Sequence, residues 1–293
     1  MNLTIKKLHP LFAAEVTGLD LRVPLAPDQL RDIHALMDQH AVLVFPNQAL
    51  DDDQQMAFGA ALGPLEQSRA TVDAHKQRLK HQQMNDISNL DTDGKLLAAD
   101  DRRRMFALGN RLWHSDSSFK ATPALYSMLH ARVIPPEGGN TEFADMRAAW
   151  DALDGKTQAK IRDLTAWHSL LYSRAQLGFT EYTEAEKAAF APVAQRLVRR
   201  LPGSGRLSLF LSSHIGRIEG MPVPEGLFLI RDLLEHATQR DFVYSHAWRV
   251  NDLVIWDNRA TLHRGRAYED TLYPRDMRRV TLMDCAPTLE QAA

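Results

Sequence analysis

Cysteine is almost absent from the sequence, in which Cys285 is the single example among 293 residues. One cysteine excludes an internal disulfide and a metal cluster held by several thiolates. Sparse cysteine fits a reducing compartment, so we expect a cytoplasmic protein. The simplest interpretation of Cys285 itself is a small packed side chain.

Long apolar runs and an excess of charge of either sign are also missing. The longest apolar stretches, such as "AVLVF" at 41–45, last only a few residues, so we expect no membrane span, signal peptide or transit peptide. With 35 lysines and arginines against 37 aspartates and glutamates, the formal net charge is -2. Locally basic stretches are surrounded by acidic residues, so nucleic acid is not an expected partner.

Core-forming residues are plentiful, since 44% of the chain is hydrophobic, and we expect residues 1–293 to form a single domain. Apolar periodicity and start signals predict helices over residues 27–40, 51–61, 145–153 and 224–238. Apolar runs predict strands over residues 41–45, 124–133, 206–212, 242–250, 252–256 and 278–284. Strands separated by unequal, partly helical insertions favour an antiparallel barrel or jelly roll decorated with helices.

Two segments carry more specific expectations. In "RLSLFLS", residues 206–212, leucine alternates with serine and phenylalanine, which is the period of a half-buried strand. Residues 66–108 are polar and weakly periodic, so we interpret them as a long excursion rather than as a linker between domains. Long excursions are often active-site lids, which predicts a mobile lid within 66–108.

A histidine and an aspartate stand two positions apart in "RLWHSDSSFK", residues 111–120. If residues 113–116 are extended, the side chains of His114 and Asp116 share one face and can bind one ion. The best third ligand is His263, in the distant segment "VIWDNRATLHRGR". Two imidazoles and one carboxylate on one side of a metal form the facial triad that holds non-haem Fe(II) and leaves its other positions open.

Each of these features also has a simpler explanation. Either histidine alone is more often a surface or core residue than a ligand. Trp256 would then be an ordinary core aromatic, and "PPEGGNT" at 135–141 would be only a turn. The arginines at 275, 278 and 279 would form a solvated face. The order of the motifs along the chain favours the functional interpretation.

In that order, H-x-D, a glycine-rich turn ending in Thr141, "WDNRATLHR" and a closely spaced arginine pair resemble the taurine and 2,4-dichlorophenoxyacetate dioxygenase family, which depends on Fe(II) and 2-oxoglutarate. The resemblance covers nearly the whole chain, including "LHPLFAAEVTGLDLR", "GGNTEFADMRAAWDAL" and "LLEHATQRDFVYSHAWRVNDLVIWDNR". It is closest to the aryloxyalkanoate dioxygenases, which cleave phenoxyacetate herbicides. It implies a mainly β fold with helical insertions around a double-stranded β-helix, the jelly-roll core of cupin-like proteins.

The resemblance also implies residue roles in three sets. The implied iron ligands are His114, Asp116 and His263. The implied 2-oxoglutarate site is lined by Thr141, Trp256 and Arg275, with the planar fork of Arg275 holding the distal carboxylate. The implied substrate residues are Arg279, which would hold the carboxylate of the primary substrate, and Asn110. The cosubstrate arginine stands one residue later after the distal histidine than in relatives, which we interpret as a loop insertion within "AYEDTLYP".

The implied reaction uses O2 and 2-oxoglutarate to hydroxylate the carbon next to the ether oxygen of an aryloxyacetate such as 2,4-dichlorophenoxyacetate. The products are the phenol and glyoxylate, with succinate and CO2. The first alternative is the same chemistry on taurine or another alkylsulfonate, because a sulfonate would also satisfy Arg279. The second is a cupin-like protein that binds a metal or ligand without oxidative activity.

Strand parity separates the closely spaced arginines. If residues 275–280 are extended, Arg275 and Arg279 share one face with Met277, while Arg278 lies on the other. We therefore expect Arg275 and Arg279 to point inward, and Arg278 to pair with acidic groups or solvent. Two guanidinium groups about 13 Å apart along a strand suit two different anions. The expected partners are thus small carboxylates, in a protein that we expect to be a homo-oligomer.

Overall fold

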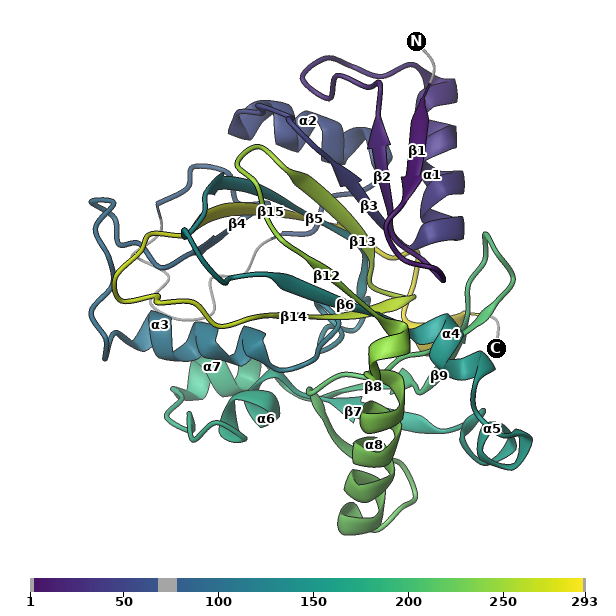
Figure 1. The fold of residues 1–293 in the computed structure, drawn as a ribbon. Helices are drawn as coiled ribbons and strands as arrows, with labels where there is room; N and C mark the ends of the chain where they lie inside the picture. The colour runs from purple at the N-terminus through teal and green to yellow at the C-terminus, as the bar shows by residue number, and fades with distance from the viewer. Residues whose placement is uncertain (1–2, 68–77, 292–293) are drawn as a thin grey trace.

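A computed structural model of the chain describes residues 3–67 and 78–291 (Figure 1). Its largest sheet has seven strands in the order β1-β2-β3-β13-β5-β15-β4. Neighbouring strands are antiparallel except for β2 and β3, which are parallel. In sheet order the strands are Thr4–Lys7, Ala14–Thr17, Val42–Phe45, Leu253–Asp257, Ala124–Val133, Asp276–Met283 and Met84–Ser88.

A three-stranded sheet with β6 in its middle lies against the larger sheet (Figure 1). Its strands are β12 (Val243–His246), β6 (Thr141–Asp145) and β14 (Thr261–Gly265). Phe143 of β6 packs between the sheets with Val254 and Trp256 of β13 and Met277 of β15, all of them buried. Two mainly antiparallel sheets packed face to face form a jelly-roll core, as expected from the sequence.

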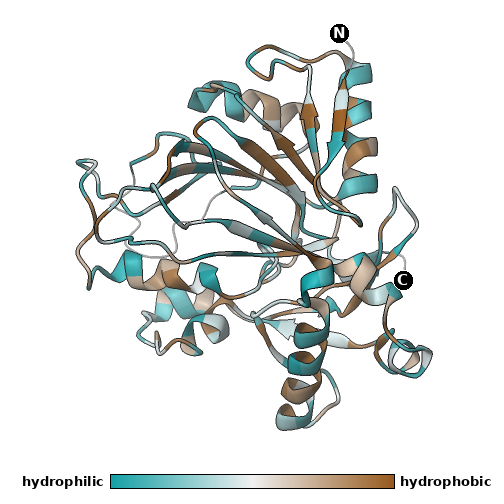
Figure 2. Ribbon diagram, viewed as in Figure 1, coloured by the Kyte–Doolittle hydropathy of each residue, from teal (hydrophilic) through white to brown (hydrophobic). Residues whose placement is uncertain are grey.

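Two helices cover the larger sheet from outside (Figure 1). They are α1 (Pro27–His40) and α2 (Asp52–Leu62). A capping box starts α2, because the side chain of Asp51 accepts a hydrogen bond from the Gln54 N–H and the side chain of Gln54 accepts one from the Asp51 N–H. Met37 of α1 and Phe58 of α2 pack on the apolar strands that Figure 2 shows in brown.

The rest of the chain packs below the smaller sheet in Figure 1. One group of elements has its own buried core, which includes Ile215 and Leu233. Its strands are β7 (Thr165–His168), β8 (Val193–Arg196), β9 (Val198–Arg200), β10 (Leu207–Leu209) and β11 (Ile215–Ile218). Its helices are α4 (Met146–Asp151), α5 (Gly155–Ile161) and α8 (Val223–Ala237). A second group surrounds Phe106 and Leu170, and it contains α3 (Arg102–Ala107), α6 (Leu170–Ala175) and α7 (Glu184–Ala189). The short 3-10 helix η2 (Leu108–Arg111) continues α3 toward the smaller sheet.

Most expected elements are confirmed, with boundaries that differ by one to a few residues. The strand predicted over 206–212 is an exception, because only Leu207–Leu209 pair and the segment is not half-buried. Leu209 and Leu211 enter the core beneath the smaller sheet. On the other side Phe210 is also buried, because His168 stacks on its ring and Arg199 lies over it. Both faces of the segment are therefore covered.

The described parts of residues 66–108, which are 66–67 and 78–108, contain more regular structure than the sequence predicts. Within them, β4 pairs with β15 at the edge of the larger sheet, and α3 packs against α6 and α7. Residues 68–77 of the predicted lid lie outside the described residues, and its mobility stays a prediction. Cys285 is exposed rather than packed, since it follows β15 in a surface segment. No helix in the described residues is long and apolar enough to cross a membrane.

Candidate active site

Three side chains predicted as metal ligands meet at one end of the smaller sheet. His114 and His263 form an antiparallel bridge, with hydrogen bonds of 3.0 and 2.9 Å between their backbone groups. Their rings lie 4.2 Å apart, centroid to centroid. A turn of the chain begins at Asp116. Its Oδ1 lies 3.8 Å from Nε2 of His114, and its Oδ2 lies 3.6 Å from Nε2 of His263. We call His114, Asp116 and His263 the triad.

The protonation states of the triad suit a divalent metal. Nδ1 of His114 lies 2.8 Å from the carbonyl oxygen of Leu112, which can only accept, so Nδ1 carries the hydrogen and Nε2 has a free lone pair. Burial lowers the pKa of both imidazoles below the ordinary range, which keeps them neutral. Burial alone would raise the pKa of Asp116, but the charge of Arg279 and the hydrogen bond from Ser127 act in the opposite direction, and that pKa lies well below the usual value. Two neutral imidazoles and one carboxylate form a donor set that fits Fe(II), with ligand atoms that lie within 4.8 Å of one another.

A buried hydrogen-bond chain fixes the Asp116 carboxylate. The Ser127 hydroxyl donates to Asp116 Oδ2 over 2.8 Å, and Asn258 Nδ2 donates to the Ser127 oxygen over 3.0 Å. Asn258 Oδ1 accepts from the Asp116 backbone N–H and from the indole N–H of Trp256. Sequence reasoning assigned no role to Ser127 or Asn258. The amide in "WDNRATLHR", next to the predicted pocket tryptophan, was the available signal.

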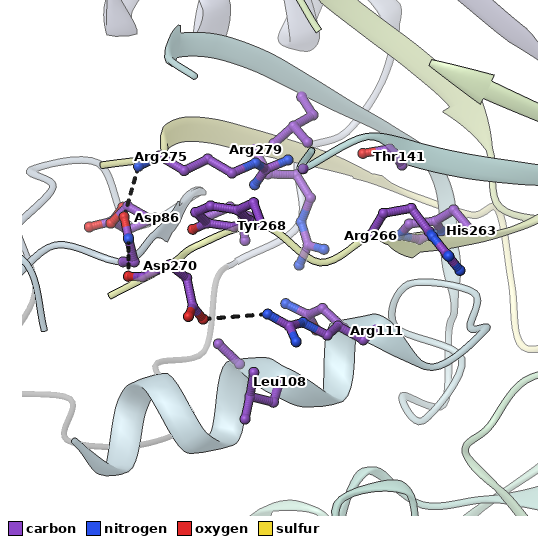
Figure 3. Close-up of a pocket in the computed structure, with 18 of the residues that line it drawn as sticks. Asp86, Leu108, Arg111, Thr141, His263, Arg266, Tyr268, Asp270, Arg275 and Arg279 are labelled. Carbon is purple, nitrogen blue, oxygen red and sulfur yellow. Dashed lines mark hydrogen bonds and ion pairs between the residues drawn. The ribbon is translucent and has the colours of Figure 1, made fainter. Parts of the chain in front are cut away.

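One pocket brings the predicted residues together (Figure 3). In the close-up, Arg275, Arg279 and Thr141 lie along the sheet side, and the helical segment with Leu108 and Arg111 faces them. Seven of the eight predicted site residues line the pocket: Asn110, His114, Thr141, Trp256, His263, Arg275 and Arg279. The eighth, Asp116, lies behind the lining and accepts a hydrogen bond of 2.5 Å from Arg279 Nη1.

The chain matches known proteins over nearly its whole length. Residues 4–281 match the family described as taurine catabolism dioxygenase TauD, TfdA family. The chain belongs to this family. It is 50% identical over 286 residues to the alpha-ketoglutarate-dependent 2,4-dichlorophenoxyacetate dioxygenase of Cupriavidus pinatubonensis, a match that covers 98% of this chain and 99% of that protein.

Two further similarities agree with this family. The dioxygenase is 37% identical over 275 residues to the (S)-phenoxypropionate/alpha-ketoglutarate-dioxygenase of Sphingobium herbicidovorans, covering 91% of this chain and 90% of that protein. It superposes with a TM-score of 0.95 and 56% identity on the crystal structure of AAD-2 in complex with Mn(II) and N-oxalylglycine, covering 98% of this chain and all of that one. The protein is therefore an Fe(II)- and 2-oxoglutarate-dependent dioxygenase that acts on a small molecule. The alternative of a binding protein without oxidative activity is set aside.

The glycine-rich turn before β6 brings Thr141 of the dioxygenase to the pocket. Gly138 and Gly139 have φ angles of +74° and +68°, and a Cβ on Gly138 would lie 2.6 Å from the carbonyl oxygen of Ala267. The Thr141 hydroxyl oxygen accepts a hydrogen bond of 3.0 Å from the indole N–H of Trp248. The hydroxyl hydrogen is then available to donate into the pocket. The sequence placed Trp248 in an expected strand but did not indicate that it contacts Thr141.

The parity prediction for the arginines agrees with the structure. Arg275 and Arg279 both line the pocket, while Arg278 points away and pairs with acidic side chains, mainly Asp276. A register irregularity occurs beside Asp276, but the extra residue belongs to β5, so the parity of β15 is preserved. The guanidinium of Arg275 has no ion-pair partner among the described residues. Burial lowers the pKa of Arg275 to about 10, although nearby Tyr268 partly offsets the effect.

An ion-pair cluster joins the two sides of the pocket. Asp270 lies 2.8 Å from Arg104 Nη2 on α3 and 3.5 Å from Arg111 Nη2 on η2, and Figure 3 draws the second contact. Asn89 Nδ2 donates to the Asp270 carbonyl over 2.7 Å, and its Oδ1 accepts from the backbone N–H of Arg275. The loop before β15 is thereby held to α3 and β4. Sequence reasoning missed this cluster because its members come from three distant segments.

Proposed function

We propose that the protein hydroxylates the carbon between the ether oxygen and the carboxylate of an aryloxyacetate such as 2,4-dichlorophenoxyacetate. The hydroxylated product breaks down to the phenol and glyoxylate, while 2-oxoglutarate gives succinate and CO2. The similarity to the Cupriavidus enzyme over nearly its whole length supports this substrate class. The observation that carries the proposal is a pocket with two guanidinium groups on one face of β15, since the reaction needs two anions side by side.

In this proposal the triad holds Fe(II), which, when bound, supplies the oxidising power drawn from O2 and 2-oxoglutarate. Arg275 binds the distal carboxylate of 2-oxoglutarate through its planar fork, and the Thr141 hydroxyl donates to the same carboxylate. The buried ring of Trp256 forms part of the pocket wall beside the triad, and its centre lies 4.7 Å from the centre of the His263 ring. The absence of an acidic partner for Arg275 in the described residues fits this role, because a buried guanidinium favours an anion.

Arg279 has a different proposed role, because its guanidinium lies beside the triad. It binds the carboxylate of the aryloxyacetate and so fixes the adjacent carbon near the metal site. Asn110 lines the pocket from η2, which faces β15, and supplies polar contact to the substrate. Orientation of this kind accounts for a large part of catalysis, because it replaces a chance encounter by a fixed geometry.

We further propose that residues 1–293 form one catalytic domain, whose lid lies within 66–108. The larger sheet supports this, because it joins β1 near the start of the chain with β15 near its end. A homo-oligomer and a cytoplasmic location remain parts of the proposal. Size-exclusion chromatography with light scattering tests the first, and a single protomer mass would contradict it.

A substrate panel tests the proposed reaction. Protein reconstituted anaerobically with Fe(II) and 2-oxoglutarate is mixed with O2 and an aryloxyacetate, a cinnamate, taurine or another alkylsulfonate, and succinate and phenol are measured. We expect one phenol for each succinate with aryloxyacetates and little succinate with sulfonates. Faster succinate release with taurine, or succinate without phenol, would contradict the assignment.

A further inference from the structure

A buried arginine lies behind the substrate side of the pocket and has no role in the function described so far. Arg174 on α6 is 5% exposed, and no aspartate or glutamate in the described parts of the chain pairs with it. Its guanidinium lies 4.7 Å from the ring centre of Phe106, and its Nη1 contacts the Ser173 hydroxyl over 3.3 Å. A buried cation without an acidic partner costs stability, so its presence calls for a functional reason.

The backbone of η2 is shaped to admit this guanidinium. A Cβ on Gly109 would lie 2.3 Å from Cζ of Arg174, closer than two non-bonded carbon atoms can approach. The guanidinium thus packs directly on the peptide that precedes Asn110. Gly109 lies in a 3-10 helix and has no left-handed φ angle, so this close approach explains the glycine.

Arg174 determines how the Asn110 side chain is oriented. Arg174 Nη2 donates to Asn110 Oδ1 over 3.1 Å. Since a guanidinium can only donate, the oxygen of the amide must face Arg174 and the Nδ2 group must face the other way. Asn110 lines the pocket, and Nδ2 has no hydrogen-bond partner within residues 3–67 and 78–291. Two N–H donors are therefore presented toward the pocket.

The charge of Arg174 also reaches the triad side of the pocket. Burial lowers the pKa of Arg174 to about 10, and its electrostatic neighbours include Asp116 and Arg279 as well as Tyr182. In Figure 3, Arg279 points from β15 toward the helical segment that carries Leu108, the segment to which Asn110 belongs. A substrate head group beside Arg279 thus meets donors from β15 and from η2.

We propose that Arg174 is a positioning residue that determines specificity for an anionic substrate. It holds Asn110 Oδ1, so that Asn110 Nδ2 donates to the carboxylate that Arg279 binds, and its own positive charge favours the anion over a neutral analogue. This inference rests on the proposed function, because it assumes a carboxylate at Arg279. It assigns no contact between Arg174 and 2-oxoglutarate.

Substitutions of Arg174 and its neighbours test this inference by binding and kinetics. Anaerobic calorimetry with the Fe(II) and 2-oxoglutarate complex measures the Kd for an aryloxyacetate, and initial rates give KM and kcat for the acid and for its neutral methyl ester. We expect Arg174→Met to raise the Kd and KM for the acid roughly tenfold or more, with 2-oxoglutarate binding nearly unchanged. Preference for the acid over the ester should fall by a similar factor. Arg174→Lys should recover part of the loss, because an ammonium also donates to Oδ1.

Two further variants act without removing Arg174. Asn110→Asp offers only acceptors and would pair with Arg174, so it should weaken binding of the acid at least as much as Arg174→Met. Gly109→Ala should displace the guanidinium and resemble Arg174→Met. Arg162→Met is a control for the loss of an arginine over an aromatic ring, because Arg162 lies over the ring of Trp150 but follows α5 in the other helical group and does not line the pocket. Thermal unfolding of each variant shows whether it is folded.

The outcomes separate this inference from the proposed function. If the wild-type protein neither binds nor cleaves aryloxyacetates, the proposed function fails before Arg174 is considered. If the wild type cleaves them and folded Arg174→Met and Asn110→Asp keep the wild-type Kd and acid preference, the positioning role is refuted. Equal losses for 2-oxoglutarate and for the acid would also refute it, because that pattern indicates general disturbance of the pocket.

Discussion

Replacing Thr141 with valine removes one hydroxyl from a buried position and leaves the side-chain shape nearly unchanged. The hydroxyl oxygen already accepts a hydrogen bond from Trp248, so the hydroxyl hydrogen is free to donate to 2-oxoglutarate. A hydrogen bond to a charged group contributes roughly 1.5–3 kcal/mol, which corresponds to a Kd roughly 10- to 150-fold higher in Thr141→Val. Anaerobic calorimetry of the Fe(II) protein with 2-oxoglutarate measures this change.

Matched variants separate the hydroxyl from the surrounding packing. Thr141→Ser keeps the donor and should bind 2-oxoglutarate nearly as tightly as the wild type. Trp248→Phe leaves the hydroxyl in place and should weaken binding less than Thr141→Val. Thr141→Val also leaves the Trp248 N–H buried without an acceptor, so its free energy of unfolding should fall by about 1–3 kcal/mol. A wild-type Kd in folded Thr141→Val would show that the residue serves only the turn.

Three other predictions follow from the same site and from the core. Alanine at any one triad position should abolish coupled succinate release while leaving the fold intact, and near-normal turnover at limiting Fe(II) would disprove that ligand. Arg275→Gln should raise the KM for 2-oxoglutarate and Arg279→Gln the KM for the aryloxyacetate, whereas Arg278→Gln should change either KM by less than about twofold, since its ion pairs are partly exposed. A large loss confined to Arg278→Gln would overturn the parity argument. Burial lowers the pKa of His168 to about 3, below that of the unfolded chain, so protonation favours unfolding as the pH falls below about 6.5. In urea unfolding, His168→Leu should then lose less stability than the wild type between about pH 7.5 and about pH 5.5, by roughly 1.4 kcal/mol over this range, and equal losses would contradict this.

Local patterns predicted much of the fold because they reflect local geometry. The strand over 124–133 and the helix over 27–40 have the predicted boundaries, since continuous apolar runs and helical periodicity depend on neighbouring residues. The segment 206–212 was misjudged for the opposite reason. Its alternation is real, but His168 and Arg199 from other strands cover the face predicted to be open.

The sequence predicted those residues of the candidate site that belong to short motifs or that share one face of a strand. Even spacing indicated that His114 and Asp116 share one face and that Arg275 and Arg279 point inward. His263 followed instead from the order of the motifs along the chain and from the family resemblance. Residues that support those groups had no such signal. Ser127 and Trp248 act only through contacts between strands that are far apart in the sequence, and Arg174 acts through Asn110.

We propose that the triad holds the metal beside a 2-oxoglutarate site formed by Arg275 and Thr141. A crystal structure of this protein with Mn(II) and N-oxalylglycine tests it most directly. We expect the metal on Nε2 of both triad histidines and on the triad carboxylate, with the distal carboxylate of the ligand on Arg275 and Thr141. A metal bound elsewhere, or a distal carboxylate held by Arg279 instead, would contradict it.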